Sequence, residues 1–355
     1  RGLGDVYKRQ AKPAASSAGA SGTAAARAYS PSPLSPVAKV TVGVLGIIPD
    51  SGIFIAQQRG YFQQEGLDVT TTPIGALMDA IAPLSAGQLD IAEGGTNAGL
   101  FNAVSRDVPV KIVADNASAP TAATSAAALM IRKDLYDAGK IKTFADLKGL
   151  KIAAAGKDNV AETWVAHALK QAGLTLKDVD YTVVSIPTIA TALANKAVDA
   201  AVVPEPFLTQ IQSQGLAVRW QGEFEMYGGN QQVGVLLYGG KTLSNQDLAK
   251  HFMVADLRGV RDYNDAFFSP AKKGRADVIN ILAKSTPIKD TSLYDKMTLT
   301  YLDPNGALDM KSMQQDADYY LSTGALKTPV DVSKAVDDSF RQYALQQLGP
   351  YQPAQ

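Results

Sequence analysis

Residues 189–207 constrain the fold of this chain more than any other stretch. They combine a helix-forming segment, an aspartate turn and the short apolar run 200–203, an order typical of a helix that leads into a buried parallel strand. Pro204 and Pro206 end that strand, because proline has no N–H to donate to a neighbouring strand and restricts the residue before it. Glu205 is therefore predicted on a rigid loop at the carboxyl end of a strand, where open α/β sheets bind their ligands.

The same order occurs earlier in the chain. Residues 77–92 again predict a helix, a turn and the start of a strand, and the loop 93–97 follows. The chain is therefore predicted to contain two related α/β units, one on each side of about Ser125. The strand-like segments 126–131 and 232–238 bracket the second unit, and we predict that they form the crossovers between two domains.

Length and composition exclude several classes of protein. With 355 residues the chain can bury two ordinary cores. Lys plus Arg equals Asp plus Glu at 34 each, so no net charge attracts nucleic acid and no nucleic-acid partner is expected. The absence of cysteine excludes disulfides, thiolate metal sites and cysteine nucleophiles. No apolar run approaches the roughly 20 residues that span a bilayer.

The first residues differ in character from the rest. Residues 5–10 resemble the translation of a sequencing adapter, so residues 1–10 are left out of the fold prediction. Residues 11–36 consist mainly of Ala, Ser, Gly and Pro, and a segment with so few bulky apolar side chains is predicted to be disordered. We expect a disordered tether over 1–37, and a native N-terminus with a signal or lipoprotein segment that is missing from this sequence.

A set of motifs in a fixed order resembles the family of ABC-transporter substrate-binding proteins for nitrate, sulfonates, taurine and thiamine-pyrimidine precursors. The last motif is Val-Asp-Ala-Ala-Val-Val-Pro-Glu-Pro-Phe at 198–207, which contains Glu205. The resemblance extends over roughly 39–237. The other motifs lie at 53–62, 65–69, 84–92, 144–153 and 168–174.

The resemblance implies an α/β protein with the two-domain periplasmic-binding-protein fold of type II. Domain I is expected to comprise 38–124 and 236–350, and domain II to comprise 125–235. A two-strand hinge formed by the crossover strands would join them. The chain after Lys241 has the pattern of several amphipathic helices, which we expect to pack on domain I.

The sequence contains no Gly-rich phosphate loop, no His-Glu-x-x-His and no Gly-x-Ser-x-Gly, so we expect no catalytic residue, no cofactor and no metal. The informative positions are polar residues in loops at strand ends, several of which precede helices whose backbone N–H groups can bind a small ligand. The alternative at each position is ordinary helix capping. The predicted ligand-binding residues are Asp50, Ser51, Gly95, Thr96, Asn97, Ser118, Asp158, Asn159, Thr188, Glu205 and Asn230.

The function follows from the resemblance. It implies a monomeric protein, in the periplasm or on the outer face of the cytoplasmic membrane, that captures a small polar organic solute of sulfonate, taurine or heterocycle type. The solute would pass to the transmembrane subunits of an ABC permease. Two alternatives share the fold: a ligand-dependent sensor partner of a membrane receptor, and an enzyme similar to thiamine-pyrimidine synthases. The enzyme is disfavoured because those proteins use a cysteine-rich loop, and this chain has no cysteine.

Charges at the predicted site act in opposite directions. Helix N-termini near Gly95 and Asn159 favour an acidic group on the ligand, whereas Asp50 and Glu205 favour a basic one. A bare inorganic anion such as nitrate is therefore disfavoured. A zwitterion or a neutral heterocycle fits better, with its donor-rich end toward Asp50 or Glu205 and its acidic or polar end toward Thr96 and Asn97.

Overall fold

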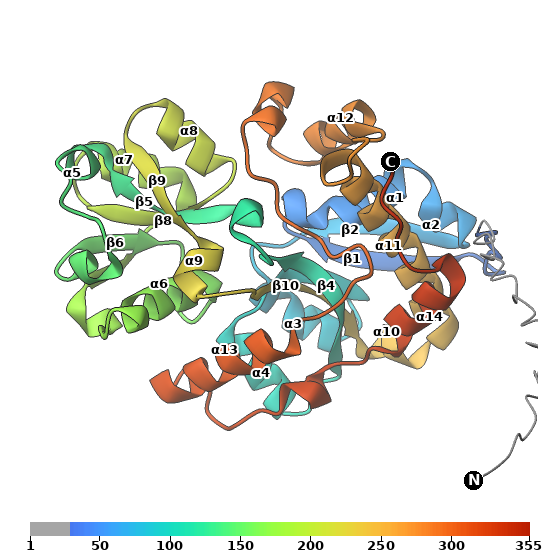
Figure 1. Ribbon diagram of the computed structural model, residues 1–355. Coiled ribbons are helices and arrows are strands. Elements are labelled where there is room, and N and C mark those ends of the chain that lie inside the picture. The colour runs from blue at the N-terminus through green and yellow to red at the C-terminus, as the bar shows by residue number, and fades with distance from the viewer. Residues whose placement is uncertain (1–28) are drawn as a thin grey trace, which may run out of the picture.

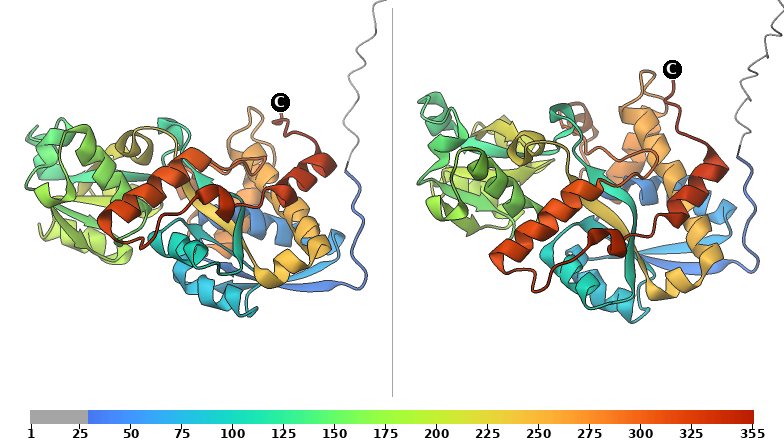
Figure 2. Two further views of the ribbon diagram at one scale, coloured as in Figure 1. Left: turned by 90° about the horizontal axis from the view of Figure 1, so that it is seen from below. Right: turned by 60° about the horizontal axis from the view of Figure 1, so that its bottom comes forward.

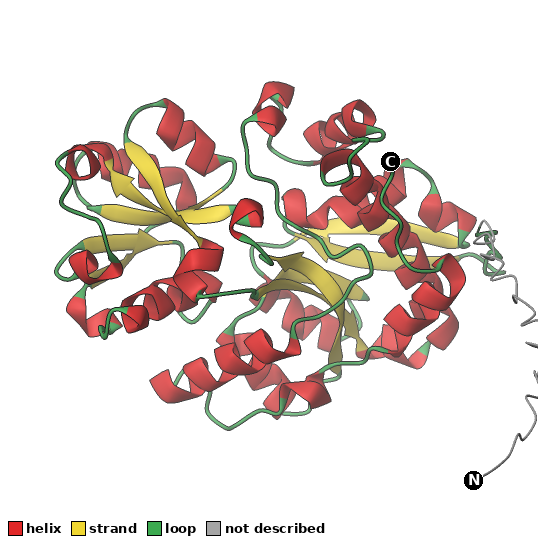
Figure 3. Ribbon diagram, in the orientation of Figure 1, coloured by secondary structure: helices red, strands yellow, loops and turns green. Residues whose placement is uncertain are grey.

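The computed structural model describes residues 29–355, and within that range the chain forms two lobes, each built on one five-stranded mixed sheet with helices on both faces (Figures 1 and 3). We call the lobe with the first sheet lobe I and the other lobe II. The predicted fold class, a two-domain periplasmic-binding-protein fold, is confirmed. Residues 1–28, which carry most of the predicted tether and the adapter-like segment, lie outside the described residues.

The two sheets repeat one topology. In lobe I the strand order is β2-β1-β3-β10-β4, with β1 parallel to β2 and β3, and β10 antiparallel to β3 and β4. In lobe II the order is β7-β6-β8-β5-β9, with the same alternation of parallel and antiparallel pairs. The strands are β1 Ala38–Val44, β2 Leu67–Pro73, β3 Ile91–Gly95, β4 Val110–Ser118, β5 Ala127–Arg132, β6 Lys151–Ala154, β7 Asp180–Val183, β8 Ala200–Pro204, β9 Ala217–Gly222 and β10 Gln232–Gly239.

Helices cover both faces of each sheet. In lobe I they are α1 Ser51–Gln58, α2 Tyr61–Gln64, α3 Leu77–Ser85, α4 Ala98–Ser105, α10 Gly240–Ser244, α11 Gln246–Phe267, α12 Arg275–Ser285, α13 Met310–Thr323 and α14 Ser339–Leu348. In lobe II they are α5 Lys133–Asp137, α6 Val160–Gln171, α7 Ile186–Ala194, α8 Phe207–Ser213 and α9 Glu223–Tyr227. No helix between residues 29 and 355 is both long and apolar enough to cross a bilayer.

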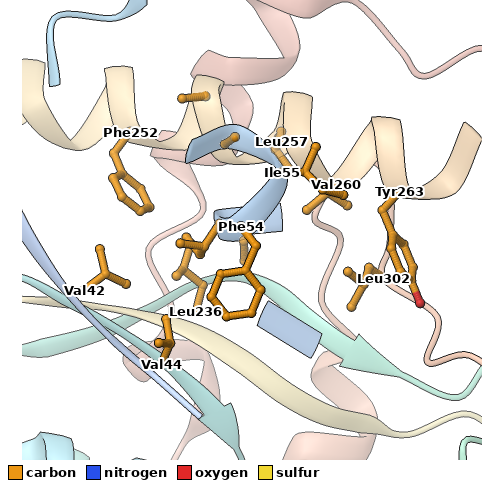
Figure 4. Close-up of a cluster of buried hydrophobic side chains, with 14 of the residues drawn as sticks. Val42, Val44, Phe54, Ile55, Leu236, Phe252, Leu257, Val260, Tyr263 and Leu302 are labelled. Atoms are coloured by element: carbon orange, nitrogen blue, oxygen red, sulfur yellow. The ribbon is translucent and has the colours of Figure 1, made fainter. Parts of the chain in front are cut away.

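The long helix α11 packs on one face of the lobe I sheet. Figure 4 shows Phe252 and Val260 of α11 in one cluster with Phe54 of α1 and Val42 of β1. The helical C-terminal region therefore packs on lobe I, as predicted. Helices α1 and α11 touch backbone to backbone, because a Cβ on Gly259 would lie 2.1 Å from the Gly52 carbonyl oxygen. A glycine at this crossing is required, and any larger residue would push the two helices apart.

The crossover prediction is wrong in detail. Strand β5 belongs to the lobe II sheet and β10 to the lobe I sheet, so the two strands are not hydrogen-bonded to each other. The segments that pass between the lobes are residues 119–126 and 228–231, and Ala119 N–H donates to Gln231 O at 3.3 Å where they meet. Strand β10 begins at Gln232, so the lobe I sheet includes residues that the predicted boundary at 236 gives to domain II.

The predicted tether is partly packed. Tyr29 donates its hydroxyl to Glu65 Oε1 at 2.5 Å, and Leu34 N–H donates to Glu65 O at 3.1 Å. Both side chains also lie against the hydrophobic core of lobe I. The expectation of disorder is therefore wrong for residues 29–37. Although the segment has few bulky apolar side chains, two of them suffice to attach it to lobe I. Figure 2 shows this segment leading along lobe I into β1.

Candidate functional site

A cavity of about 620 Å³ lies between the two lobes, and both lobes contribute to its lining. Lobe I supplies residues 46–49, 117–118 and several between 286 and 300, and lobe II supplies 126–127, Trp164, Ile186, 204–207, Gln210 and Glu223. A second hollow of about 760 Å³ is formed by lobe I residues alone. A third hollow, of about 630 Å³, also involves both lobes and is lined by polar residues such as His167, Lys311 and Ser312. The first cavity is the candidate ligand site, because both lobes line it and most of its wall is apolar.

Apolar side chains make up most of the cavity wall. Ile48 and Pro49 come from the turn after β1, Trp164 from α6 and Phe207 from the start of α8, with Leu299 opposite. Trp164 is buried, and its indole N–H donates to Gln231 Oε1, so the ring contributes its apolar surface and its polar atom is satisfied elsewhere. A wall of this kind binds a ligand largely by removing apolar surface from water.

Asp50 lies beneath this wall. Its Oδ2 accepts hydrogen bonds from Gly46 N–H at 2.6 Å and Ile47 N–H at 3.0 Å, so its carboxylate shapes the turn after β1. The side chain is fully buried, and burial raises its pKa to about 6. Ser51 is also buried and donates to Ile48 O. Both predicted ligand contacts are therefore placed under the cavity-lining turn, outside the cavity lining.

Two further buried carboxyl groups lie near Asp50. Burial raises the pKa of Asp256 to about 7, and burial together with the Asp50 charge raises the pKa of Glu93 well above its usual range. Each of these three side chains has one oxygen without a hydrogen-bond partner. Among residues 29–355, no group of three or more His, Asp or Glu side chains is arranged to hold a metal ion. The cluster instead makes the turn sensitive to protonation, because ionising neighbouring buried carboxyls is costly.

The predicted helix N-termini face each other across the lobes. Asn97 caps α4, its Oδ1 accepting from Leu100 N–H at 2.9 Å, and Asn159 caps α6, its Oδ1 accepting from Glu162 N–H at 3.3 Å. A β-bridge joins these two asparagines. Ala98 N–H donates to Asp158 O at 3.0 Å in the same contact. The structure thus uses Asn97, Asp158 and Asn159 for capping and for contact between the lobes.

Gly95 and Thr96 directly precede Asn97, which makes the contact between the lobes. Gly95 ends β3, so residues 93–95 are strand and the predicted loop begins later. Thr96 is buried and its N–H donates to Val233 O at 3.0 Å, which extends the pairing of β3 with β10. Neither residue lines the cavity.

Ser118 and Glu205 do line the cavity, from opposite lobes. Ser118 ends β4 and is buried. Glu205 follows β8, and its carboxylate accepts from Thr209 N–H at 3.0 Å, Thr209 Oγ1 at 2.9 Å and Thr298 N–H at 3.2 Å. Burial raises the pKa of Glu205 above its usual value. Since Thr298 belongs to lobe I, the carboxylate also links the lobes beside the cavity.

Thr188 and Asn230 lie apart from the cavity. Thr188 is exposed in the first turn of α7 and donates to Ser185 O at 2.9 Å. Asn230 is exposed in the crossover segment, and its amide donates to Asp309 Oδ2 at 2.6 Å. The structure therefore gives these two predicted residues no place in the cavity lining.

Glu223 is a cavity residue that the sequence analysis missed. It opens α9 directly after β9, its side chain is buried, and its Oε1 accepts from Ala126 N–H at 2.9 Å. Burial raises its pKa to about 8. Its position at the end of a strand is the signal that led to Glu205, and the same reasoning applied to residue 223 would have found it. The lining between 286 and 300 carries no comparable signal.

The two-lobed fold with a cavity between the lobes is that of periplasmic binding proteins. Residues 50–271 match the model of the family described as NMT1/THI5 like, and the chain belongs to this family. The predicted resemblance is therefore confirmed. A comparison with curated proteins gives no significant match.

Several solved structures are similar to this chain in fold. The alkanesulfonate-binding protein SsuA from Xanthomonas axonopodis pv. citri, bound to MOPS, is 20% identical with a TM-score of 0.65, covering 85% of this chain and 98% of that one. The periplasmic aliphatic sulphonate binding protein SsuA from Escherichia coli is 19% identical with a TM-score of 0.65, covering 84% and 92%. The periplasmic nitrate-binding protein NrtA from Synechocystis PCC 6803 is 16% identical with a TM-score of 0.67, covering 88% and 89%.

Proposed function

We propose that this protein is the extracytoplasmic solute-binding component of an ABC importer and holds a small organic molecule between its lobes. The observation that carries the proposal is the cavity of about 620 Å³ to which both lobes contribute. Membership of the NMT1/THI5-like family supports it, as does the fold that the chain shares with sulfonate- and nitrate-binding periplasmic proteins. Binding requires no covalent step, so the protein acts as a receptor and not as an enzyme.

The mechanism is closure of two lobes on the solute. Within residues 29–355, only the segments 119–126 and 228–231 connect the lobes along the chain, and such a two-segment link permits rotation of one lobe against the other. A solute that touches both lobes stabilises the closed arrangement by its differential affinity for it. In this proposal the closed monomer, in the periplasm or at the outer face of the membrane, presents both lobes to the transmembrane subunits of the permease.

The predicted site residues take different parts in this proposal. Ser118 and Glu205 contact the solute, since both line the cavity. Asp50 and Ser51 shape the turn beneath it, and Asn97 with Asn159 closes the lobes beside it. Binding energy comes mainly from the apolar wall, and the polar groups orient the solute.

A thermal-shift screen followed by scattering tests the proposal. The screen covers sulfonates, nitrate, carboxylates, amines and pyrimidines at neutral pH. A true solute at about 100 times its Kd adds roughly 2.7 kcal/mol to the native state, which raises Tm measurably. Small-angle scattering with and without that solute should then give a smaller radius of gyration when it is bound. A screen in which no compound of any class raises Tm contradicts the proposed function.

A further inference from the structure

The cavity lining offers little positive charge to a ligand. The Arg219 guanidinium lies outside the lining, where its charge acts on Glu205 and Glu223 and its N–H groups donate to Ser125 O and Thr298 Oγ1. Among the described residues that line the cavity, the one cationic side chain is Lys289. Its Nζ donates to Ala283 O at 2.8 Å and Lys284 O at 3.1 Å, at the C-terminal end of α12. The ammonium group is therefore held at a helix C-terminus, where the dipole favours a cation, and does not serve the cavity.

Several backbone N–H groups around the cavity already donate to carboxylates of the chain itself. Asp50 accepts from Gly46 and Ile47 at the lobe I wall. Glu205 accepts from Thr209 in the first turn of α8. An anionic ligand would need these donors, because anions in proteins are bound by N–H groups at turns and helix N-termini or by cationic side chains.

Glu223 completes this pattern on lobe II. Its carboxyl oxygen accepts from Ala126 N–H, at the point where the chain enters β5. At the N-termini of α4 and α6, one backbone N–H likewise donates to the capping side chain, Asn97 or Asn159. Several of the N–H donors that would favour an acidic ligand group are therefore used within the chain.

Besides apolar surface, the lining offers a ligand uncharged donors such as the Gln210 amide and the Thr300 hydroxyl, together with the acceptor capacity of its two glutamates. An ionised carboxylate has about four acceptor positions. Glu205 uses three of them, on Thr209 and Thr298. Glu223 lines the same cavity. Burial raises the pKa of Glu223 to about 8, so this carboxyl is mostly protonated at neutral pH unless a cation lies beside it. An anion beside ionised Glu205 would be repelled and desolvated, whereas an ammonium group would gain charge-assisted hydrogen bonds and favour the ionised form of Glu223.

We propose that the solute is a mainly apolar molecule whose polar end is an amine, and that Glu205 and Glu223 receive this amine. Sulfonates and inorganic anions are then poor ligands, although the fold is shared with proteins that bind them. This inference rests on the proposed function, since it names the class of solute for the same cavity.

Pairs of compounds with one apolar body and opposite end groups test the inference in the unmodified protein. The pairs are 2-phenylethylamine with 2-phenylethanesulfonate, and tryptamine with indole-3-propionate. Nitrate and methanesulfonate serve as anions that lack the large apolar group. Calorimetry at constant ionic strength should give a Kd at least about tenfold lower for the amine of each pair. Neither nitrate nor methanesulfonate should bind.

Two isosteric variants and one control locate the amine. Glu205→Gln and Glu223→Gln should each weaken amine binding about tenfold and leave the anion of the pair unaffected or bound more tightly. Asp137→Asn, an exposed carboxylate of lobe II in an ion pair with Lys133, should change nothing. Circular dichroism and Tm establish that each variant is folded. If Glu223→Gln does not fold, the preference of the wild-type protein for the amine of each pair still tests the inference.

The outcomes separate the two proposals. Tighter binding of the sulfonate or carboxylate of each pair overturns the amine inference and leaves the proposed function standing. Amine binding that both glutamine variants retain overturns the assignment to Glu205 and Glu223. If the amines fail while compounds of another class raise Tm in the wider screen, the inference fails alone. If no compound of any class binds, the proposed function fails with it.

Discussion

The two lobes meet on two sides of the cavity, and these sides are built differently. On one side, which we call the crossover side, Tyr227 at the end of α9 and Gln231 of the segment 228–231 both donate to Asp316 of α13, at 2.9 and 2.8 Å. On the other, which we call the mouth side, Glu205 accepts from Thr298 N–H at 3.2 Å and Arg219 donates to Thr298 Oγ1 at 3.4 Å. The crossover groups are buried, and the mouth groups are partly exposed.

This difference indicates where the molecule opens. Breaking a buried hydrogen bond leaves polar groups without water, whereas partly exposed groups rehydrate at little cost. The crossover side is further supported by Tyr319 of α13, which donates to Glu162 of α6 at 2.9 Å. Figure 2 shows α13 extending from lobe I toward lobe II. We therefore expect the crossover side to be the pivot and the mouth side to separate when solute leaves.

The largest effect is expected from Asp316→Ala on the crossover side. The substitution leaves the buried Tyr227 hydroxyl and Gln231 amide with only their longer hydrogen bonds, to Ser312 O and Thr163 Oγ1 at 3.2 Å each. It should lower the free energy of unfolding by about 3 kcal/mol. Urea denaturation measures the change. Asp318→Ala on the same helix is the control, because its exposed carboxylate only accepts from Gln314 at 2.9 Å. A cost for Asp316→Ala as small as that of the control would contradict the pivot.

Removal of residues 29–37 should have the next largest effect. A chain that begins at residue 38 loses the contacts that the half-buried Tyr29 and Leu34 make with lobe I, which we expect to lower the free energy of unfolding by about 2 kcal/mol. A chain that begins at residue 29 is the control. Solute affinity should be equal in both, because the segment touches neither side of the cavity. Equal stability of the two chains would show that the segment does not stabilise lobe I.

The sequence predicts those parts of this comparison that depend on neighbours along the chain. Strand β8 and the position of Glu205 follow from an apolar run closed by Pro204 and Pro206. The caps Asn97 and Asn159 follow from their places before helices. In each case the determining contacts lie within a few residues.

The sequence could not predict which polar groups near the cavity are already hydrogen-bonded to other parts of the chain. Asp50 looks like a ligand contact until its two bonds to Gly46 and Ile47 are seen. The pairing of Gln231 with Asp316 joins residues 85 positions apart, and no local pattern marks it. Glu205 has a local signal, but its link to Thr298 across the lobes has none. The sequence therefore locates the ends of the strands. Tertiary contacts determine which polar groups at those ends are free to bind a ligand.

Stability should fall as pH rises from about 5 to 8, and the crossover side should contribute to this fall. Burial raises the pKa of Asp316 to about 7, whereas an unfolded aspartate ionises near 4. The folded chain thus keeps a proton that the unfolded chain loses, so the stabilisation present below about pH 4 is lost as pH rises through about 7. Asp115 and Asp256, with pKa values raised by burial to about 7, act in the same direction.

Thermal unfolding at several pH values checks this expectation. The wild-type Tm should fall on the order of a few degrees between pH 5 and 8, and Asp316→Asn should fall less because its amide does not titrate. Asp318→Asn again serves as the control and should follow the wild type. A Tm that rises over this range would contradict the assignment of raised pKa values to the buried carboxyls.

The smallest effect on stability, with the clearest effect on shape, is expected from Arg219→Ala on the mouth side. The guanidinium donates to Thr298 Oγ1 of lobe I and to Ser125 O at 2.8 Å, so the variant loses one of the two contacts that hold the mouth closed. Because these groups are partly exposed, the free energy of unfolding should change by less than about 1 kcal/mol. Scattering without solute should nevertheless show a larger radius of gyration than the wild type, and a bound solute should dissociate faster.

Thr298→Ala removes the same hydrogen bond from the lobe I side, because it lacks the hydroxyl that accepts from Arg219. It keeps the backbone N–H that donates to Glu205, so it should reproduce the shape change without altering the contact of Arg219 with Ser125. If Arg219→Ala costs as much stability as Asp316→Ala, or leaves the radius of gyration unchanged, the two sides of the cavity do not differ in the way their contacts indicate.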